Sequence, residues 1–261
     1  MKRIGLALGG GGVRGVAHIA YIKALEELGL RPSVISGTSS GAIAGAMYAG
    51  GMTPDEMLDS LKDVISLRHG KAGGNARPER KTGGMAETAA RRRLMRLLPK
   101  TRFEELDIPL KVVATNFHTL KERVFDSGEL LPAIMASVAL PSAFPPQLVD
   151  GEYYVDGGAT NIVPFDIIRN ECDILIAIDV SLVRPAILKP TLKNAGHATW
   201  AATQEAYIDT KLKLCSVEVF ERPSFDSIST LEFFKFKKVY DQAMTYVPGF
   251  IEKLKNADIK G

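Results

Sequence analysis

The chain has 261 residues, of which 46% are hydrophobic and 24% charged, a globular composition that excludes disorder for most of its length. The net charge of +3 does not indicate nucleic acid as a partner, and the two cysteines lie far apart, without the spacing of metal ligands. We therefore expect a single domain over residues 1–261 in a reduced, cytoplasmic setting, with no metal and no cofactor.

The first predicted elements alternate between strand and helix. Residues 4–8 form an apolar run, which glycines at positions 9–12 interrupt before it reaches the length of a signal-peptide core, so we expect a buried strand. A helix from about Val16 to Leu28 follows, with Gly29 as its C-cap, and a second strand begins at Val34. This alternation predicts a largely parallel sheet covered by helices.

The glycine loop, residues 9–15, has three competing interpretations. A dinucleotide site needs an acidic residue at the end of the second strand, where a serine, a glycine and a threonine stand instead. A P-loop needs a closing Gly-Lys-Ser/Thr, which is missing. We favour an oxyanion hole formed by the amides of Gly10, Gly11 and Gly12 at a helix N-terminus. Arg14 either anchors this loop or touches a head group.

The pattern Gly37-x-Ser39-x-Gly41 follows the second strand directly and precedes a small-residue segment with helical character. It has the form of a nucleophile elbow, a turn so tight that the residues flanking the serine must lack bulk. The Ser39 hydroxyl would stand at a helix N-terminus, where the dipole favours a developing oxyanion. The alternative is that Ser39 or Ser40 merely caps the helix.

After a predicted helix over Met52–Leu67, the sequence becomes rich in glycine and basic residues and poor in apolar ones. Residues 68–102 form a basic insertion, with glycine and basic residues over 69–82 and Arg91–Arg93 on a following helix. Two interpretations stay open for it. It is either a solvated loop and helix face or a mobile flap that meets anionic head groups.

Further apolar strands are predicted over 108–116 and 173–180, with a shorter one over 123–125. A helix over 130–140 is expected to stop at Pro141, because proline cannot continue a helix. These elements extend the strand and helix alternation across two thirds of the chain.

A hairpin is predicted between strands 147–149 and 153–155, because Asp150-Gly151 is a strong turn signal. Its second strand ends at Asp156, followed by two glycines that permit close approach of another backbone. Asp156 is therefore either a site carboxylate or only a turn residue or N-cap. The rest of the chain is mostly helical, and its amphipathic segment Leu231–Val247 is expected to pack on the sheet.

Four motifs together resemble the bacterial patatin-like phospholipase family. They are, in order, the glycine loop, the elbow, the block Ala136–Pro141 and the triplet Asp156-Gly157-Gly158. The resemblance runs from about Ile4 to Val180. It implies an α/β fold, a three-layer α/β/α sandwich with a largely parallel central sheet, and an acyl hydrolase that uses a Ser-Asp dyad without a catalytic histidine.

By position, the resemblance assigns Ser39 as the nucleophile, Asp156 as its partner and Gly10, Gly11 and Gly12 as the oxyanion loop. The implied reaction is cleavage of a carboxylic ester of a phospholipid or lysophospholipid through an acyl-enzyme. Expected partners are a lipid or other acyl ester and, reversibly, a membrane surface, since no stretch reaches the roughly 18 apolar residues of a membrane span.

Three alternatives to this reaction stay open. A Ser-His-Asp esterase is the nearest, because Ser39, Asp156 and His197 occur in the α/β-hydrolase order. Acyl transfer to an acceptor other than water would use the same acyl-enzyme. A nucleotide-binding module would use the glycine loop alone.

Overall fold

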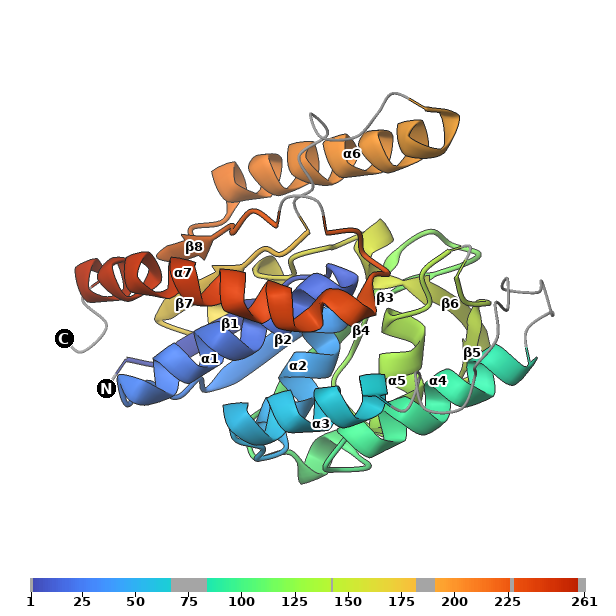
Figure 1. The fold of residues 1–261 in the computed structure, drawn as a ribbon, viewed down its shortest axis with the longest axis horizontal. Coiled ribbons are helices and arrows are strands. Elements are labelled where there is room, and N and C mark those ends of the chain that lie inside the picture. Colours follow the sequence, from blue (N-terminus) through green and yellow to red (C-terminus); the bar gives the residue numbers. More distant parts are fainter. Residues whose placement is uncertain (1, 67–83, 142, 182–190, 226–227, 258–261) are drawn as a thin grey trace.

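The computed structural model of the chain describes residues 2–66, 84–141, 143–181, 191–225 and 228–257. These residues form one eight-stranded sheet in the order β5-β6-β3-β2-β1-β7-β8, with β4 pairing β3 off this path (Figure 1). The strands are β1 Ile4–Leu8, β2 Val34–Thr38, β3 Leu110–Asn116, β4 Glu122–Phe125, β5 Gln147–Val149, β6 Glu152–Asp156, β7 Ile174–Ile178 and β8 Val219–Glu221.

The helices flank this sheet. They are α1 Ala17–Glu27, α2 Ser40–Ala49, α3 Pro54–Ser66, α4 Gly84–Leu97, α5 Leu130–Ser137, α6 Leu192–Leu214 and α7 Phe236–Asn256. Within the described ranges, five short 3₁₀ turns connect these elements, at Gly12–Val16, Phe103–Glu105, Gly157–Ala159, Asp166–Glu171 and Phe233–Lys235. The C-cap of α1 is Leu28, and the predicted Gly29 follows it in the left-handed conformation that ends many helices, with φ of +69°.

Each strand sends alternate side chains to opposite faces of the sheet. Leu6 and Leu8 of β1 belong to a large core cluster with α1, α2, α5 and α7, whereas Ala7 belongs to a smaller cluster on the other face. Residues 162–172 and Ile208 of α6 complete that second cluster. In Figure 1, α6 lies on the opposite side of the molecule from α3 and α4. The three layers confirm the predicted α/β/α sandwich, and β1, β2, β3, β7 and β8 run parallel in it.

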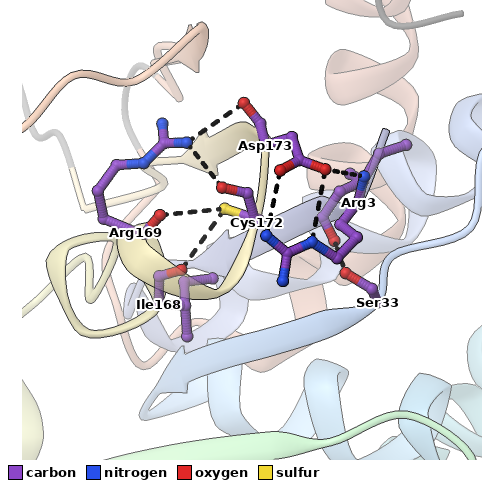
Figure 2. A network of polar contacts seen from close by, with 7 residues as sticks. Arg3, Ser33, Ile168, Arg169, Cys172 and Asp173 are labelled. Carbon is purple, nitrogen blue, oxygen red and sulfur yellow. Dashed lines mark hydrogen bonds and ion pairs between the residues drawn. The ribbon is translucent and has the colours of Figure 1, made fainter. Parts of the chain in front are cut away.

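A polar network joins the amino ends of the parallel strands (Figure 2). The Arg3 amide donates to the Asp173 carboxylate at 2.7 Å, and the Arg3 guanidinium donates to the same carboxylate at 3.1 Å. Nearby, the Ser33 hydroxyl donates to the Ile4 carbonyl at 3.1 Å. The starts of β1, β2 and β7 are thereby aligned with one another, so their carboxyl ends also meet at one level.

Strand β3 pairs with three other strands, β2, β4 and β6, instead of two. Val112 and Val113 pair with both β2 and β4, while Ala114 and Thr115 pair with both β4 and β6. Because a strand has only two edges, β2 and β6 must share the edge of β3 that β4 does not occupy. They lie end to end along it, running in opposite directions, and meet beside Val113 and Ala114.

The predicted end of the helix over 130–140 is wrong. The helix, α5, ends at Ser137, four residues before Pro141. The chain leaves the helix early because the Ala139 carbonyl accepts a hydrogen bond from the Asp156 amide at 3.1 Å. A contact with the end of β6 therefore ends the helix before the position where its sequence predicts an end.

The C-terminal amphipathic segment also departs from expectation. Its helix, α7, starts at Phe236 rather than at Leu231 and extends to Asn256. It packs mainly on α1, with the Phe250 ring edge-on to the Tyr21 ring at a centroid distance of 5.0 Å. It also contacts the sheet at the edge strand β8, where Lys253 Nζ donates to the Glu221 carboxylate at 2.7 Å. The short strand β8 was not predicted at all.

Residues 67–83, which hold most of the glycine-rich part of the predicted basic insertion, lie outside the described residues. The described part is α4, whose Leu94 and Leu97 are buried. Arg91 and Arg92 on the same helix are exposed. The interpretation of this segment as a flap, and the assignment of residues 1–261 to one domain, stay predictions.

We expect Phe250→Ala to lower the free energy of unfolding by about 3–5 kcal/mol, because it removes a fully buried ring at the interface of α7 with α1. Chemical denaturation followed by circular dichroism would measure the change. Leu214→Ala, at an apolar side chain that is 84% exposed, is the control and should change stability by less than about 0.5 kcal/mol. A loss at position 250 no larger than in this control would contradict the packing of α7 on α1.

Candidate active site

Ser39 stands at the junction of β2 and α2 in a strained backbone conformation. Its φ of 53° and ψ of −118° lie outside the regions that a residue with a side chain normally adopts. Such a conformation costs on the order of 1–3 kcal/mol and persists only where its surroundings enforce it. Ser39 occupies the N-cap position of α2, yet its hydroxyl makes no capping hydrogen bond. The hydroxyl is therefore not used in the way that the capping alternative requires.

Two neighbours hold the Ser39 backbone in place. The Ser39 amide donates to the hydroxyl of Ser137, a fully buried residue at the end of α5, at 2.8 Å. On the other side, the Ser39 carbonyl accepts from the amides of Ala42 and Ile43, at 3.0 and 3.2 Å, in the first turn of α2. Both peptide groups next to the Ser39 side chain are thus engaged, which leaves the side chain as the projecting part of the turn.

The meeting of β2 and β6 brings Asp156 to Ser39. Thr38, the last residue of β2, pairs with Val113, and Asp156, the last residue of β6, pairs with Ala114. The space between the two strand ends is small, since a Cβ on Gly157 would lie 2.2 Å from the Val113 carbonyl oxygen. Only glycine fits there, which explains why glycine follows Asp156.

Asp156 is buried, with 5% of its surface exposed. Burial raises the pKa of its carboxyl group from the ordinary 3.8 to about 6, while hydrogen bonds from the Gly158 amide and the Ser39 side chain act in the opposite direction. The Gly158 bond is 2.7 Å long and also makes Asp156 the N-cap of a short 3₁₀ turn. The predicted N-cap role of Asp156 is thus present together with its contact to Ser39.

The glycine loop lies against the same serine. A Cβ built on Gly10 would be 3.2 Å from the Ser39 Cβ. The Gly10 amide itself donates to the Ile162 carbonyl at 2.9 Å, so it is already occupied. The amides of Gly11 and Gly12 have no acceptor within the part of the chain that the structure describes. Of the three predicted oxyanion donors, these two are available for a ligand.

His197, the histidine of the alternative Ser-His-Asp triad, belongs to α6. His18, by contrast, supports the glycine loop, with its Nε2 atom 2.7 Å from the Gly9 carbonyl oxygen. Burial lowers the pKa of His18 to about 4, so its ring is neutral near pH 7 and Nε2–H donates to that carbonyl. The same helix α6 brings Trp200 to within 3.9 Å of a Cβ built on Gly158, a neighbour of the site that sequence reasoning missed.

The described residues hold no cluster of three or more histidine, cysteine or acidic side chains that could bind a metal ion. Among the same residues, no helix has the length and apolarity needed to cross a bilayer. Taken together, the site offers a projecting hydroxyl, a buried carboxyl group beside it and amide donors nearby. These groups are the parts that nucleophilic catalysis on an acyl carbon needs.

Comparison with known proteins agrees with this chemical interpretation of the site. A family model described as patatin-like phospholipase matches residues 6–169. Mouse patatin-like phospholipase domain-containing protein 6 is 29% identical over 282 residues, which cover 93% of this chain and 20% of that protein. Lysophospholipase nte1 of Aspergillus fumigatus is 26% identical over 285 residues, covering 98% of this chain and 18% of its own length. The chain thus spans about a fifth of the length of these curated relatives.

Among solved structures, the crystal structure of VipD from Legionella pneumophila matches 95% of this chain and 67% of its own, with a TM-score of 0.52 and 15% sequence identity. At that identity the similarity concerns the fold alone. It agrees with the layered α/β arrangement described above.

The raised pKa of Asp156 predicts a pH-dependent cost to stability. The folded value of about 6 exceeds the unfolded value, so the fold favours the protonated carboxyl and the wild type loses stability as pH rises through 4 to 6. Asp156→Asn has no such titration. Relative to the wild type, we expect the unfolding free energy of Asp156→Asn to rise by about 2 kcal/mol between pH 4 and 7.5.

Denaturant unfolding at several pH values would measure this difference. Asp150→Asn, at an exposed turn, is the control for the substitution itself. A stability difference between Asp156→Asn and the wild type that does not change with pH would contradict the burial of the carboxyl group.

Proposed function

The chain belongs to the patatin-like phospholipase family, and on this basis we propose that it hydrolyses carboxylic ester bonds of phospholipids or lysophospholipids through a Ser39–Asp156 dyad. The observation that carries the dyad is the meeting of the ends of β2 and β6, which places the buried Asp156 carboxyl group near enough to the Ser39 side chain for that hydroxyl to lower its pKa. The similarity to a patatin-like phospholipase domain protein and to a lysophospholipase supports the lipid class of substrate.

In the proposed reaction, the Asp156 carboxylate accepts the Ser39 proton while Ser39 Oγ attacks the carbonyl carbon of the ester. Negative charge develops on the carbonyl oxygen, where the amides of Gly11 and Gly12 would donate to it. Collapse of the intermediate expels the alcohol part, which takes the proton from Asp156. Water then attacks the acyl-enzyme with Asp156 again as the base, releasing the fatty acid and Ser39.

The burial of Asp156 has a chemical role in this scheme. A carboxylate of ordinary pKa is a weak base, and a value nearer the working pH makes proton transfer more favourable. Because its pKa is raised to about 6, Asp156 is a stronger base and is still mostly ionised at pH 7. A histidine is then unnecessary, whereas the triad alternative requires His197 to contact both side chains.

We further propose reversible contact with a membrane surface through the end of the sheet that carries Ser39. The turn after β3 exposes Phe117 and Leu120, with 48% and 74% of their surface in water. The Phe117 amide donates to the carbonyl of half-exposed Tyr153 at 2.8 Å, so this patch continues onto β6, three residues before Asp156. Exposed aromatic and aliphatic side chains with a neighbouring lysine, Lys121, suit the interface of a lipid bilayer.

The nucleophile assignment predicts that Ser39→Ala abolishes hydrolysis of a short-chain nitrophenyl ester and labelling by a fluorophosphonate probe. His197→Ala should retain turnover within about twofold, because the dyad needs no histidine. Steady-state kinetics and mass spectrometry of the labelled residue would test both. Retained hydrolysis in Ser39→Ala would refute the nucleophile, and inactivity of a folded His197→Ala protein would favour the triad.

Membrane contact predicts that Phe117→Ser combined with Leu120→Ser lowers the fraction of protein that sediments with phospholipid vesicles by about tenfold. Hydrolysis of the soluble nitrophenyl ester should stay the same, since neither side chain contacts Ser39 or Asp156. Leu214→Ser, at an equally apolar exposed residue at the end of α6, is the matched control. Equal vesicle binding by the double variant and the wild type would contradict the proposed surface.

A further inference from the structure

Arg14 is a charged residue in an unfavourable position. It lies in the 3₁₀ turn Gly12–Val16, directly after the glycines of the loop, with only 3% of its surface exposed. Burial lowers the pKa of its guanidinium group to about 10, and the negative charge of Asp179 partly offsets this effect. Burying a cation opposes folding unless its hydrogen bonds and a counter-charge compensate, so the contacts of Arg14 indicate what it does.

Two of the hydrogen bonds that Arg14 donates share one acceptor, the Gly11 carbonyl oxygen of the glycine loop. Its Nε–H donates to the Gly11 oxygen at 3.2 Å, and its own backbone amide donates to the same oxygen at 3.3 Å. A terminal guanidinium nitrogen also donates to the Thr230 hydroxyl at 3.4 Å. The backbone carbonyl of Thr230 in turn accepts from the Val13 amide at 2.9 Å. The Gly11 carbonyl is therefore held from inside the protein by two donors.

Fixing this carbonyl also fixes the amide of the next residue. The Gly11 oxygen and the Gly12 N–H belong to one planar trans peptide, in which the two groups point in opposite directions. Since the oxygen points toward Arg14, the Gly12 N–H points away from Arg14. That N–H has no acceptor among the described residues, and the loop lies against Ser39.

We propose that Arg14 is a positioning residue, which holds the Gly11–Gly12 peptide so that the Gly12 amide faces the oxyanion formed on Ser39. The proposal rests on the hydrolase function proposed above. It also decides between the two roles that the sequence left open for Arg14. A guanidinium buried against the Gly11 carbonyl anchors the loop and is not presented to a lipid head group.

The test compares Arg14→Met, which has similar length but no donor, with Arg14→Lys, which can still donate one hydrogen bond. The matched control is Arg222→Met, because Arg222 is an arginine that contacts the Asp179 carboxylate, at 2.8 Å, and no contact with the loop is found for it among the described residues. Each variant is assayed for kcat and KM on a soluble nitrophenyl ester. Inhibition by an alkyl trifluoromethyl ketone is measured too, since its adduct with serine places an oxyanion in the hole.

We expect Arg14→Met to lower kcat by about tenfold to a hundredfold, approaching the effect of losing one oxyanion donor, with KM changed by less than about twofold. Affinity for the trifluoromethyl ketone should fall by a similar factor. Arg14→Lys should recover most of both losses, and Arg222→Met should keep kcat within about twofold of the wild type.

Three results would overturn the proposal: wild-type kcat in a folded Arg14→Met protein, loss of kcat without loss of ketone affinity, or an equal loss of kcat in Arg222→Met. If Arg14→Met does not fold, Thr230→Val removes one contact of the same guanidinium. It should lower kcat by about threefold at constant KM, and an unchanged kcat would then refute the role. If the proposed hydrolase function is itself wrong, the wild-type protein will be inactive. This result differs from every outcome that concerns Arg14 alone.

Discussion

The candidate site depends on two strands sharing one edge of β3. β2 runs along this edge as far as Val113, and β6 arrives from the opposite direction as far as Ala114. Neither strand can continue, because the other occupies the next position. The chain must therefore turn out of the sheet at Ser39 and again after Asp156. The tight turn at the serine and its contact with a carboxyl group thus have the same steric origin.

This arrangement places unfavourable features where chemistry would use them. Ser39 has a strained backbone, Asp156 is a buried carboxyl group, and Arg14 is a buried cation. Each one lowers stability by itself, and each is held by contacts from a different element, such as the Ser137 hydroxyl on the Ser39 amide. Proteins commonly break the rules of stable folding at functional sites and compensate for this elsewhere.

The features that could be predicted from the sequence are those with a local cause. Strands such as β1 and β7 are continuous apolar runs because both their faces are buried, and the elbow around Ser39 is a local motif. Asp156 was assigned only through the family resemblance, since its approach to Ser39 arises from pairing with β3. The role of the Ser137 hydroxyl and the occupied amide of Gly10 have no local signal. The early end of α5 likewise comes from a bond to a residue distant in sequence.

The central position of β1 has a consequence for how the protein folds. Gly5 pairs with Val34 on one side but with Leu175 on the other, so the second edge of this apolar strand stays unpaired until most of the chain has been synthesised. Long-range parallel pairing of this kind slows folding, and an open apolar edge can bind other chains in the meantime. The contacts of Arg3 with Asp173 join these same two distant segments. The sheet is therefore completed late, and an incomplete chain exposes an apolar strand edge that favours aggregation until β7 pairs with it.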